Sequence, residues 1–487
     1  MSIPITGTVL IPLGLILAML PWRFCLAGLV VFTMMSPAAV VNVGKFGLQP
    51  GYYLSLLLIG RTALQVITER LTLNGFVISQ MRPLFWFIAT TFAVLFIALC
   101  FFQGSIETLP GTAGYKSGLT RPFQLARENF TQLTYLILNA CLVYSMAHAG
   151  ARQKPLQLVT AWDRAIMCGL LFAAAVCVWQ FVALYGGFYF PTDFFYSNAG
   201  YSRADSQSMV GLFRINGPFE EPSVLGYNFS GFLLYAWARN RLHPTGPSLA
   251  MIAACIFCLV MSTATSAYMG LFLFAAVALF DAAKREKVFQ RAKRKISSLY
   301  LVVIAFIFVG LLGGAVVVAD NWQAIEFILK TTLFNKSGSN SFQQRSYADY
   351  LALQVFAQTY GIGIGLGSHK GNSLLLTLIS NTGVVGILLF GTFVYARFRW
   401  KATLEPGLPP AVAAASVRPF KLGLLGLLAI HLVSNPNLSV LALWISMGGL
   451  LALQASERRQ GFAARRDPMP AKDFSPSGNP YPSHAPV

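Results

Sequence analysis

Long apolar runs alternate with short polar segments along most of the chain. A membrane-spanning helix needs about 20 mostly apolar residues, and runs of that kind lie near residues 4–21, 24–43, 50–67, 84–102, 131–148, 165–184, 222–238, 248–263, 266–282, 298–319, 373–396, 421–434 and 438–455. The pattern predicts an all-α fold, a polytopic transmembrane helical bundle of about 12–13 spans. We interpret the first run as a retained span, because no basic segment precedes it and no small-residue cleavage site follows it.

The composition agrees with a bilayer as the solvent. Hydrophobic residues make up 55% of the 487 residues and charged residues only 11%, whereas soluble domains carry about 25% charged residues. The seven cysteines lie in or beside apolar runs, which favours packing thiols over disulfides. No group of His, Cys, Asp or Glu has metal-ligand spacing, and no P-loop occurs, so we expect no metal and no cofactor.

The positive charge of the chain lies in short loops. The net charge is +19, from 36 Lys plus Arg against 17 Asp plus Glu. In a soluble protein this excess would suggest nucleic acid. Here the basic residues gather between apolar runs, above all in segment 284–295 and after Glu457, as they do in cytoplasmic loops of membrane proteins. We therefore expect the lipid bilayer, and no nucleic acid, as a partner.

The basic loops set the predicted topology. If they face the cytoplasm, the spans from residue 131 onward alternate, and two long loops, about 185–222 and 320–372, fall outside, with a shorter one at about 103–130. The side of the N-terminus stays open. We expect residues 1–455 to form a single integral membrane domain and residues 456–487 a disordered, basic cytoplasmic tail, rich in Pro, Ser and charge.

The first long outer loop contains many aromatic residues and ends in a charged turn. The aromatic residues are typical of an interfacial belt or of sugar stacking, and both interpretations stay open. The end of the loop reads R-I-N-G-P-F-E-E-P-S, from Arg214 to Ser223. Glu221 before Pro222 suits a helix start. An arginine beside Glu220 and Glu221 at membrane depth is costly, and such charges are often functional.

The second long outer loop contains Arg345 and a glycine-rich stretch, G-I-G-I-G-L-G-S-H-K-G-N-S, from Gly361 to Ser373. No βαβ unit surrounds it, so we exclude a dinucleotide site. A glycine-rich turn before a helix can present backbone N–H groups to phosphate. His369 and Lys370 lie within the stretch. Together the two loops supply groups that could hold a pyrophosphate and move a proton.

Three other polar positions have simpler interpretations. Arg61 interrupts an apolar run, and we expect its side chain to extend to the interface. Residues 435–437 (Asn-Pro-Asn) predict a hydrogen-bonded turn between the last two spans. Asp349 is expected to be solvated.

Three ordered stretches resemble the bacterial O-antigen ligase and polysaccharide polymerase (Wzy-type) superfamily over roughly residues 130–450. They are Arg214 to Ser223, residues 262–268 (S-T-A-T-S-A-Y), and Arg345 with the glycine-rich stretch and L-I-S-N-T-G-V-V-G at 378–386. The Glu-Pro-Ser and Ser-Asn-Thr-Gly forms look more like exopolysaccharide polymerases than ligases, in which a Glu stands near the place of Asn381.

The resemblance implies a metal-independent glycosyltransferase at the periplasmic face of the bacterial inner membrane, with undecaprenyl-pyrophosphate-linked oligosaccharide as substrate. It implies that Arg214 and Arg345, with Lys370 nearby, bind the pyrophosphate. Glu221 or His369 would accept the proton of the acceptor hydroxyl, and Glu220 is the alternative to Glu221. The polymerase is favoured over the O-antigen ligase, and a chain-length regulator and export proteins are further partners that the resemblance admits.

Two other functional classes fit many spans. A transporter of polysaccharide or lipid-linked glycan would place charged residues near the bilayer midplane, often with inverted repeats. The predicted midplane is nearly uncharged, and no repeat is evident. A non-catalytic scaffold in an export complex would use the basic loops and the tail for docking.

Overall fold

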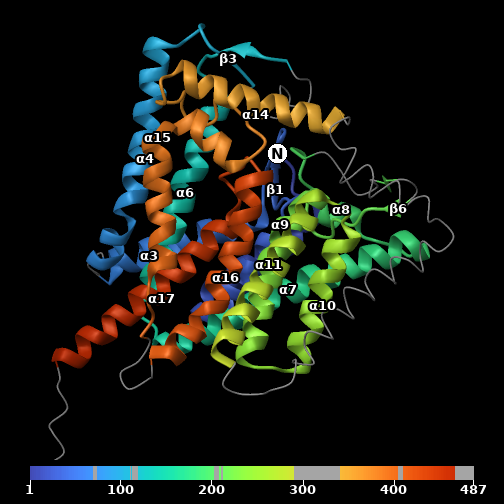
Figure 1. Cartoon of the computed structure of the whole chain (residues 1–487), viewed down its shortest axis with the longest axis vertical. Coiled ribbons are helices and arrows are strands. Elements are labelled where there is room, and N and C mark those ends of the chain that lie inside the picture. The colour runs from blue at the N-terminus through green and yellow to red at the C-terminus, as the bar shows by residue number, and fades with distance from the viewer. Residues whose placement is uncertain are drawn as a thin grey trace, which may run out of the picture.

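Fourteen helices and three short hairpins make up the described part of the chain in a computed structural model (Figure 1). The structure describes residues 1–69, 74–109, 111, 119–201, 208–209, 212–289, 340–403 and 410–466. The fold is all-α, as predicted. The helices are α1 (Ile5–Met19), α2 (Trp22–Met34), α3 (Pro50–Thr68), α4 (Gly75–Phe101), α6 (Arg127–Gly150), α7 (Pro155–Gly186), α8 (Thr192–Phe195), α9 (Pro222–Leu242), α10 (Gly246–Met261), α11 (Thr265–Phe289), α14 (Asn340–Gln358), α15 (Leu374–Arg399), α16 (Pro410–Ser434) and α17 (Leu441–Arg466).

The strands form three separate antiparallel ribbons. They pair β1 (Val41–Val43) with β2 (Phe46–Leu48), β3 (Glu107–Thr108) with β4 (Arg121–Pro122), and β5 (Ser208–Met209) with β6 (Leu212–Phe213). In the first ribbon Val41 stands opposite Leu48, and in the second Glu107 stands opposite Pro122. Each ribbon joins two helices and stays short, so the hydrophobic core is formed by helix packing.

The described helices fit a multi-pass membrane protein. Six are long and apolar enough to cross a membrane: α4, α6, α7, residues 265–282 of α11, α15, and residues 412–434 of α16. α1, α2 and α10 are shorter apolar helices. The multi-pass helical class is therefore confirmed, whereas the predicted number of spans is reached only in part. The predicted span at 298–319 lies outside the described residues.

α9 lies in the interior of the bundle and packs against α16, α10 and α11 (Figure 1). Nearly all of its residues are buried, including the polar Asn228, Ser230 and Asn240. Protein rather than lipid surrounds this helix, which is why it is less apolar than its neighbours. Small residues permit close helix contacts here: a Cβ added at Gly270 of α11 would lie 1.8 Å from the Ser230 hydroxyl oxygen.

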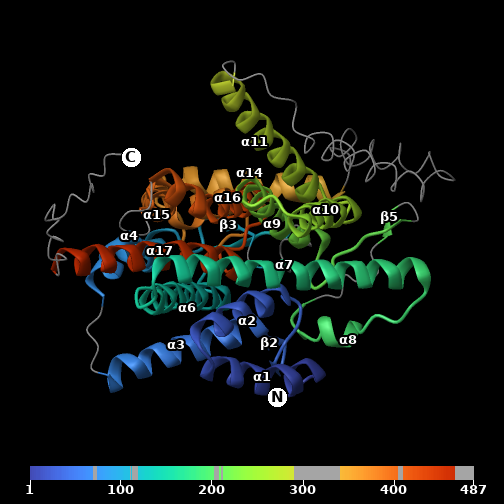
Figure 2. The same ribbon diagram turned by 90° about the horizontal axis from the view of Figure 1, so that it is seen from below.

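The other helices form layers on either side of α6 and α7. Viewed along the long axis, α1, α2 and α3 lie on one side of this pair, and α9, α10, α15 and α16 lie on the other (Figure 2). α2 packs on α7, α3 on α6, and α17 along α6. The α6–α7 pair therefore connects the N-terminal helices to the part of the bundle that contains α9.

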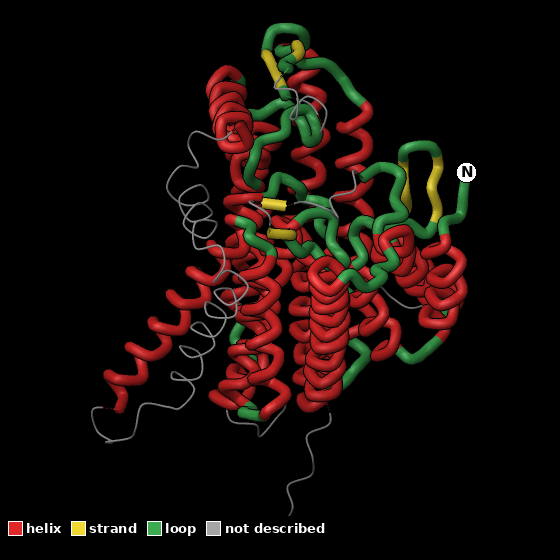
Figure 3. The backbone as a smooth tube through the Cα atoms, turned by 90° about the vertical axis from the view of Figure 1, so that its right-hand side faces the viewer, coloured by secondary structure: helices red, strands yellow, loops and turns green. Residues whose placement is uncertain are grey.

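The hairpins, the longer loops and the N-terminus gather at one end of the bundle, which we call the loop end (Figure 3). Ser2 and Asn42 exchange two backbone hydrogen bonds of 2.9 Å, and the Asn42 amide donates to the Ser197 carbonyl at 2.9 Å. These bonds place the N-terminus at the same end of the bundle as the first long loop.

The structure bears on two further predictions, one for Arg61 and one for the residues after 455, at the opposite end of the bundle. Arg61 donates to the carbonyl oxygens of Ala18 and Leu20 at 2.9 and 2.7 Å, so it caps the end of α1. α17 continues to Arg466, past residue 455, where we placed the start of a disordered tail. Helix-forming Ala, Gln, Glu and Arg residues follow Ser456 and extend the helix. Residues 467–487 lie outside the described part.

We predict that Gly270→Leu disrupts the packing of α11 on α9. The added side chain has no space beside Ser230, and overpacking of this kind costs about 1–3 kcal/mol. Size-exclusion chromatography of the detergent-solubilised protein and limited proteolysis should show a smaller folded fraction. Gly391→Leu in α15 is the matched control, because a Cβ at Gly391 meets nothing within 4 Å. Equal folded yields for both variants would contradict the close α9–α11 contact.

Candidate functional site

The turn before α9 is held by a side-chain amide. Gln180 of α7 accepts from the backbone N–H groups of Asn216 and Gly217 at 2.9 and 2.7 Å, and donates to the Asn216 side-chain oxygen at 2.8 Å. Gly217 has φ +57° and lies against Cys177, where a Cβ would come within 2.3 Å of the sulfur. The buried turn therefore has a fixed position on α7. It also fixes the positions of Arg214, which precedes the turn, and of Glu220 and Glu221, which follow it.

The first and second sequence stretches are in contact. Arg214 donates through Nε to the Ser262 carbonyl at 3.2 Å, and the Ser266 hydroxyl donates to the Ser223 carbonyl at 3.1 Å. Thr263 between them has φ +47°, a costly conformation for a β-branched residue. The sharp α10–α11 turn thus lies against the N-terminus of α9, where the Ser223 hydroxyl donates to the Glu221 carboxylate at 3.2 Å.

α15 is broken at Gly383, which has φ +62° and ψ −166°. The backbone carbonyl groups released before the break accept from the glycine-rich stretch: Ser380 from the Ile364 N–H at 3.1 Å, and Asn381 from the Gly365 N–H at 2.9 Å. After the break, the Val384 N–H donates to the Gly361 carbonyl at 3.0 Å. The stretch thus satisfies backbone groups that the broken helix leaves unpaired.

The side chain of Asn381 completes this connection. Its oxygen accepts from the backbone N–H groups of Ser368 and His369 at 3.1 and 3.0 Å, and its nitrogen donates to the carbonyls of His369 and Thr377 at 2.8 and 2.7 Å. Asn381 is fully buried and holds the loop in a fixed shape. Asn381 therefore has a positioning role in this loop.

The glycines of the stretch permit close approach to other elements. A Cβ at Gly365 would lie 2.8 Å from the Leu95 Cα, and one at Gly367 would lie 2.5 Å from the Glu128 carbonyl oxygen. The stretch also uses its own backbone N–H groups within the protein, namely those of Gly363, Ile364, Gly365, Ser368, His369 and Lys370. This geometry does not favour the phosphate cradle of backbone N–H groups that we considered from the sequence.

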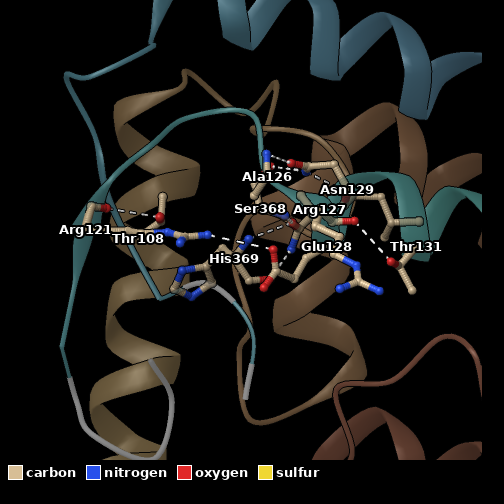
Figure 4. A network of polar contacts seen from close by, with 11 residues as sticks. Thr108, Arg121, Ala126, Arg127, Glu128, Asn129, Thr131, Ser368 and His369 are labelled. Atoms are coloured by element: carbon tan, nitrogen blue, oxygen red, sulfur yellow. Dashed lines mark hydrogen bonds and ion pairs between the residues drawn. The ribbon is translucent and has the colours of Figure 1, made fainter. Parts of the chain in front are cut away.

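His369 lies in a polar network where three outer segments meet (Figure 4). Its Nδ1 accepts from the Leu109 backbone N–H at 3.2 Å, and its Nε2 lies 3.2 Å from the Ala348 carbonyl. Next to it, Asn129 of α6 donates to the Ser368 hydroxyl at 2.7 Å. Burial lowers the pKa of His369 to about 4, so its ring is neutral at pH 7. Both nitrogens face backbone groups, which favours a positioning role over proton transfer.

α14 brings Arg345 to the same end of the bundle. One turn further along the helix, Asp349 accepts from the backbone N–H of Asn372 at 2.9 Å. Burial raises the pKa of Asp349, although its hydrogen bonds from Asn372 and the charge of Arg345 act in the opposite direction. We expected Asp349 to be solvated. It is instead half-buried and connects α14 to the loop that contains Lys370.

The charged residues of the two long loops lie close enough to interact. Burial lowers the pKa of Arg214; Glu221 acts against this shift and the positive charge of Arg345 adds to it. The positive charge of Lys370 in turn acts to lower the pKa of Glu220. Electrostatic influence thus links Arg214 with Glu221 and Arg345, and Glu220 with Glu221 and Lys370, while the ring of His369 faces backbone groups.

Two cavities lie beside these charges and share a wall at Asn437. One, of about 80 Å³, is lined by Glu220 and by several tyrosines, among them Tyr52, Tyr135, Tyr201 and Tyr227. The other, of about 220 Å³, is lined by Lys370, His369, Glu128 and Gln132. Asn437 belongs to the expected turn, which is confirmed because the Asn437 N–H donates to the Asn435 side chain at 2.9 Å.

Glu220 has the most perturbed environment of the acids that the structure places in this region. Burial raises its pKa to about 7; the neighbouring Glu221 acts in the same direction, whereas Lys370 and a hydrogen bond with Tyr201 act against it. Glu221, by contrast, is exposed at the start of α9. A carboxyl group with a pKa near 7 suits general base catalysis at neutral pH. The geometry therefore favours Glu220 over Glu221 for proton transfer, the reverse of the order inferred from the sequence.

The aromatic residues of the first outer loop divide into three groups. Phe188 and Tyr189 are exposed, as in an interfacial belt. Phe195 is buried against Trp179 and Phe190 in a ring cluster. Tyr201 lines the cavity beside Glu220. Of the rings named here, Tyr201 is the one that lines a cavity together with Glu220.

Comparison of the chain with protein-family models, with curated proteins and with solved structures found no match. Among the described residues, no three His, Cys, Asp or Glu side chains gather as metal ligands do. The sequence analysis missed Asn129, because it is a common polar residue whose partners, Leu366 and Ser368, lie far away in the sequence. Asn437 was expected only as part of a turn, and Tyr201 only as one of the aromatic residues of its loop; neither was expected to line a cavity.

We predict that Glu220→Gln changes how stability depends on pH. The folded protein keeps Glu220 protonated up to about pH 7, whereas a carboxyl group of the unfolded chain ionises near 4.5. Stability contributed by the protonated group is therefore lost as the pH rises from about 4.5 through 7. The glutamine avoids this loss, so the free energy of unfolding of the variant at pH 8 should exceed that of the original protein by about 3 kcal/mol.

Thermal unfolding in detergent at pH 5 and pH 8 measures this difference. Glu221→Gln is the matched control, because it removes the adjacent, exposed carboxylate and should leave most of the pH dependence in place. Identical pH dependence in the original protein and the Glu220 variant would show that this carboxyl group ionises normally.

Proposed function

We propose that this protein polymerises undecaprenyl-pyrophosphate-linked oligosaccharide repeat units into a surface polysaccharide or exopolysaccharide at the periplasmic face of the bacterial inner membrane. The observation that carries the proposal is that Glu220 and Lys370 line two cavities that share Asn437, while the charges of Arg345 and Glu221 act on Arg214. Two loops separated by more than a hundred residues supply these groups, and together they combine cations for a pyrophosphate with a carboxyl group suited to accept a proton.

The proposed reaction uses each group once. Arg214 and Arg345 bind the pyrophosphate of the donor, and Lys370 adds charge toward Glu220. The acceptor hydroxyl attacks the anomeric carbon of the donor sugar, and Glu220 takes the hydroxyl proton. The new glycosidic bond forms as the bond from that carbon to the phosphate oxygen breaks. Undecaprenyl pyrophosphate leaves with the bonding electrons, and the arginines stabilise its increased negative charge.

The neighbouring glutamate and histidine have other roles in this proposal. Glu221 begins α9 and contacts Ser223, and its charge helps to keep the proton on Glu220 before substrate binds. His369 positions Lys370 through its contacts with Leu109 and Ala348. Tyr201, which shares a hydrogen bond with Glu220, is in place to orient the acceptor.

An O-antigen ligase, which transfers glycan from undecaprenyl pyrophosphate to lipid A core, is the alternative within the same chemistry. It would use the same cations and the same base, so the acceptor alone separates the two enzymes. A transporter would need charged groups along the centre of the bundle. The charges named above gather instead at the loop end, which favours the enzyme. Chain-length regulators and export proteins are the partners that a polymerase of this kind would have.

We predict that Arg345→Ala and Glu220→Gln each reduce polymer synthesis at least about hundredfold, because each removes a group that acts on the transition state. The measurement is the size distribution of surface and secreted polysaccharide in a deletion strain complemented with each variant. Glu107→Gln is the control, because it removes an exposed acid of β3 at the same end of the bundle.

The products separate the candidate functions. Single repeat units that accumulate on lipid carrier or on lipid A core indicate a polymerase. Polymer of normal length that stays on its carrier and is absent from lipid A core indicates a ligase. Normal polymer with both variants removes the catalytic proposal, and glycan flipping by the purified protein in vesicles would then support a transporter.

We further predict that the rate of the purified enzyme rises with pH and levels off above about 7, because Glu220 must lose its proton to act as a base and burial raises its pKa to about 7. Initial rates between pH 5 and 9 with a lipid-linked repeat unit give the profile. Glu220→Asp should keep a similar profile at a lower rate, whereas Glu220→Gln should have no such rise. A flat profile for the original enzyme would exclude Glu220 as the base.

A further inference from the structure

A further cavity, separate from the two at the loop end, lies at the opposite end of the bundle. It has a volume of about 660 Å³ and lies between the start of α4, the end of α15, residues 400–403 and α17. Arg399, Lys401 and Arg458 line it and give it a positive charge, and Gln80 and Gln454 add amide groups. We call this region the basic cavity. None of its residues takes part in the proposed transfer reaction.

Among the described residues, the one acid that lines the basic cavity, Glu457, already has hydrogen-bond donors. The Glu457 carboxylate accepts from the Trp400 indole N–H at 3.0 Å and from the Thr403 backbone N–H at 2.7 Å. Lys421 of α16 donates to the Phe398 carbonyl at 3.1 Å and supports the same segment from behind. These contacts give the rim a fixed shape. Among the described residues, Arg399 and Lys401 have no carboxylate partner.

A buried guanidinium stands directly behind the wall. Arg397 is fully buried, and its Nη2 donates to the side-chain oxygen of Gln80 at 3.1 Å. Its Nε and Nη1 have no hydrogen-bond partner among the described residues, and neither does the side-chain oxygen of Gln454. Within that same part of the chain, Arg397 pairs with no carboxylate. Its ring contact is with Phe393, at 5.2 Å.

A buried cation without a counterion is costly, and an anion that approaches it reduces that cost. Phosphate fits the donors present, because arginine and lysine bind its oxygens through charge-assisted hydrogen bonds. We propose that the basic cavity binds a phosphate group, supplied either by the headgroup of an anionic lipid or by free phosphate. This site is independent of the proposed glycosyltransferase activity.

The surroundings of the basic cavity favour a lipid as the source of the phosphate. Phe76 and Trp400 lie at its rim, and aromatic residues of this kind occupy the headgroup level of bilayers. α4 and α15 pack together and expose large apolar side chains beyond the rim, among them Trp86 and Leu388. Acyl chains would cover these surfaces while the phosphate lies among the basic residues.

The experiment measures binding to the full-length protein in detergent by native mass spectrometry. The three ligands are phosphatidylglycerol, zwitterionic phosphatidylcholine and inorganic phosphate. Phosphatidylglycerol should bind at least about tenfold more tightly than phosphatidylcholine, and the double variant Arg399→Gln with Lys401→Gln should lose about that tenfold preference. Arg82→Gln is the matched control: it removes an exposed cation of α4 that does not line the cavity, and it should bind as the original protein does.

A second variant tests the buried guanidinium. Arg397→Met should abolish the rise in unfolding temperature that phosphatidylglycerol produces in the original protein, whatever its effect on the stability of the protein alone. Equal stabilisation by inorganic phosphate and phosphatidylglycerol, lost in the double variant, would identify free phosphate as the ligand. Binding of phosphatidylglycerol and phosphate that is the same in the original protein, the double variant and the Arg397 variant would overturn the proposal.

Discussion

The break in α15 at Gly383 is the constraint on which the loop end depends. A helix interrupted inside a bundle leaves backbone groups that need partners, and here the glycine-rich stretch supplies them. Asn381 adds side-chain bonds to the same stretch. The stretch is thereby fixed against α15, and through the contact of His369 with Leu109 it also holds the shorter outer loop. Lys370 comes to lie near Glu220 as a result of this chain of contacts.

At the loop end, the environment of the two arginines differs from that of Glu220. The charge of Arg345 lowers the pKa of Arg214, and the nearby Glu221 acts against this effect. Glu220 lines a cavity with several tyrosines, and because its pKa is about 7 it is about half protonated at pH 7, so it can both accept and release a proton.

Some of this could be predicted from residue patterns, and some could not. Apolar runs identify the helices because lipid and protein interiors both select for them, and the glycines at 363, 365 and 367 indicate close approach of backbones. Helix α9 was harder to identify from its sequence, because a helix surrounded by protein can contain polar residues such as Asn228 and Ser230. The choice between Glu220 and Glu221 depends on enclosure by Tyr52 and Tyr201, which come from elements far apart in the chain. The neutral state of His369 depends likewise on Leu109 and Ala348.

The framework of the loop end is built largely from uncharged amides. Gln180 holds the turn before α9, Asn129 joins α6 to Ser368, and Asn381 holds the glycine-rich stretch. Amide hydrogen bonds do not titrate, and dissolved ions screen them little. Added salt should thus leave the scaffold intact and weaken only the long-range attraction of the arginines and Lys370. Measured ionic-strength dependence of substrate capture would accordingly count the charges that contact the substrate, without a contribution from unfolding of the loops.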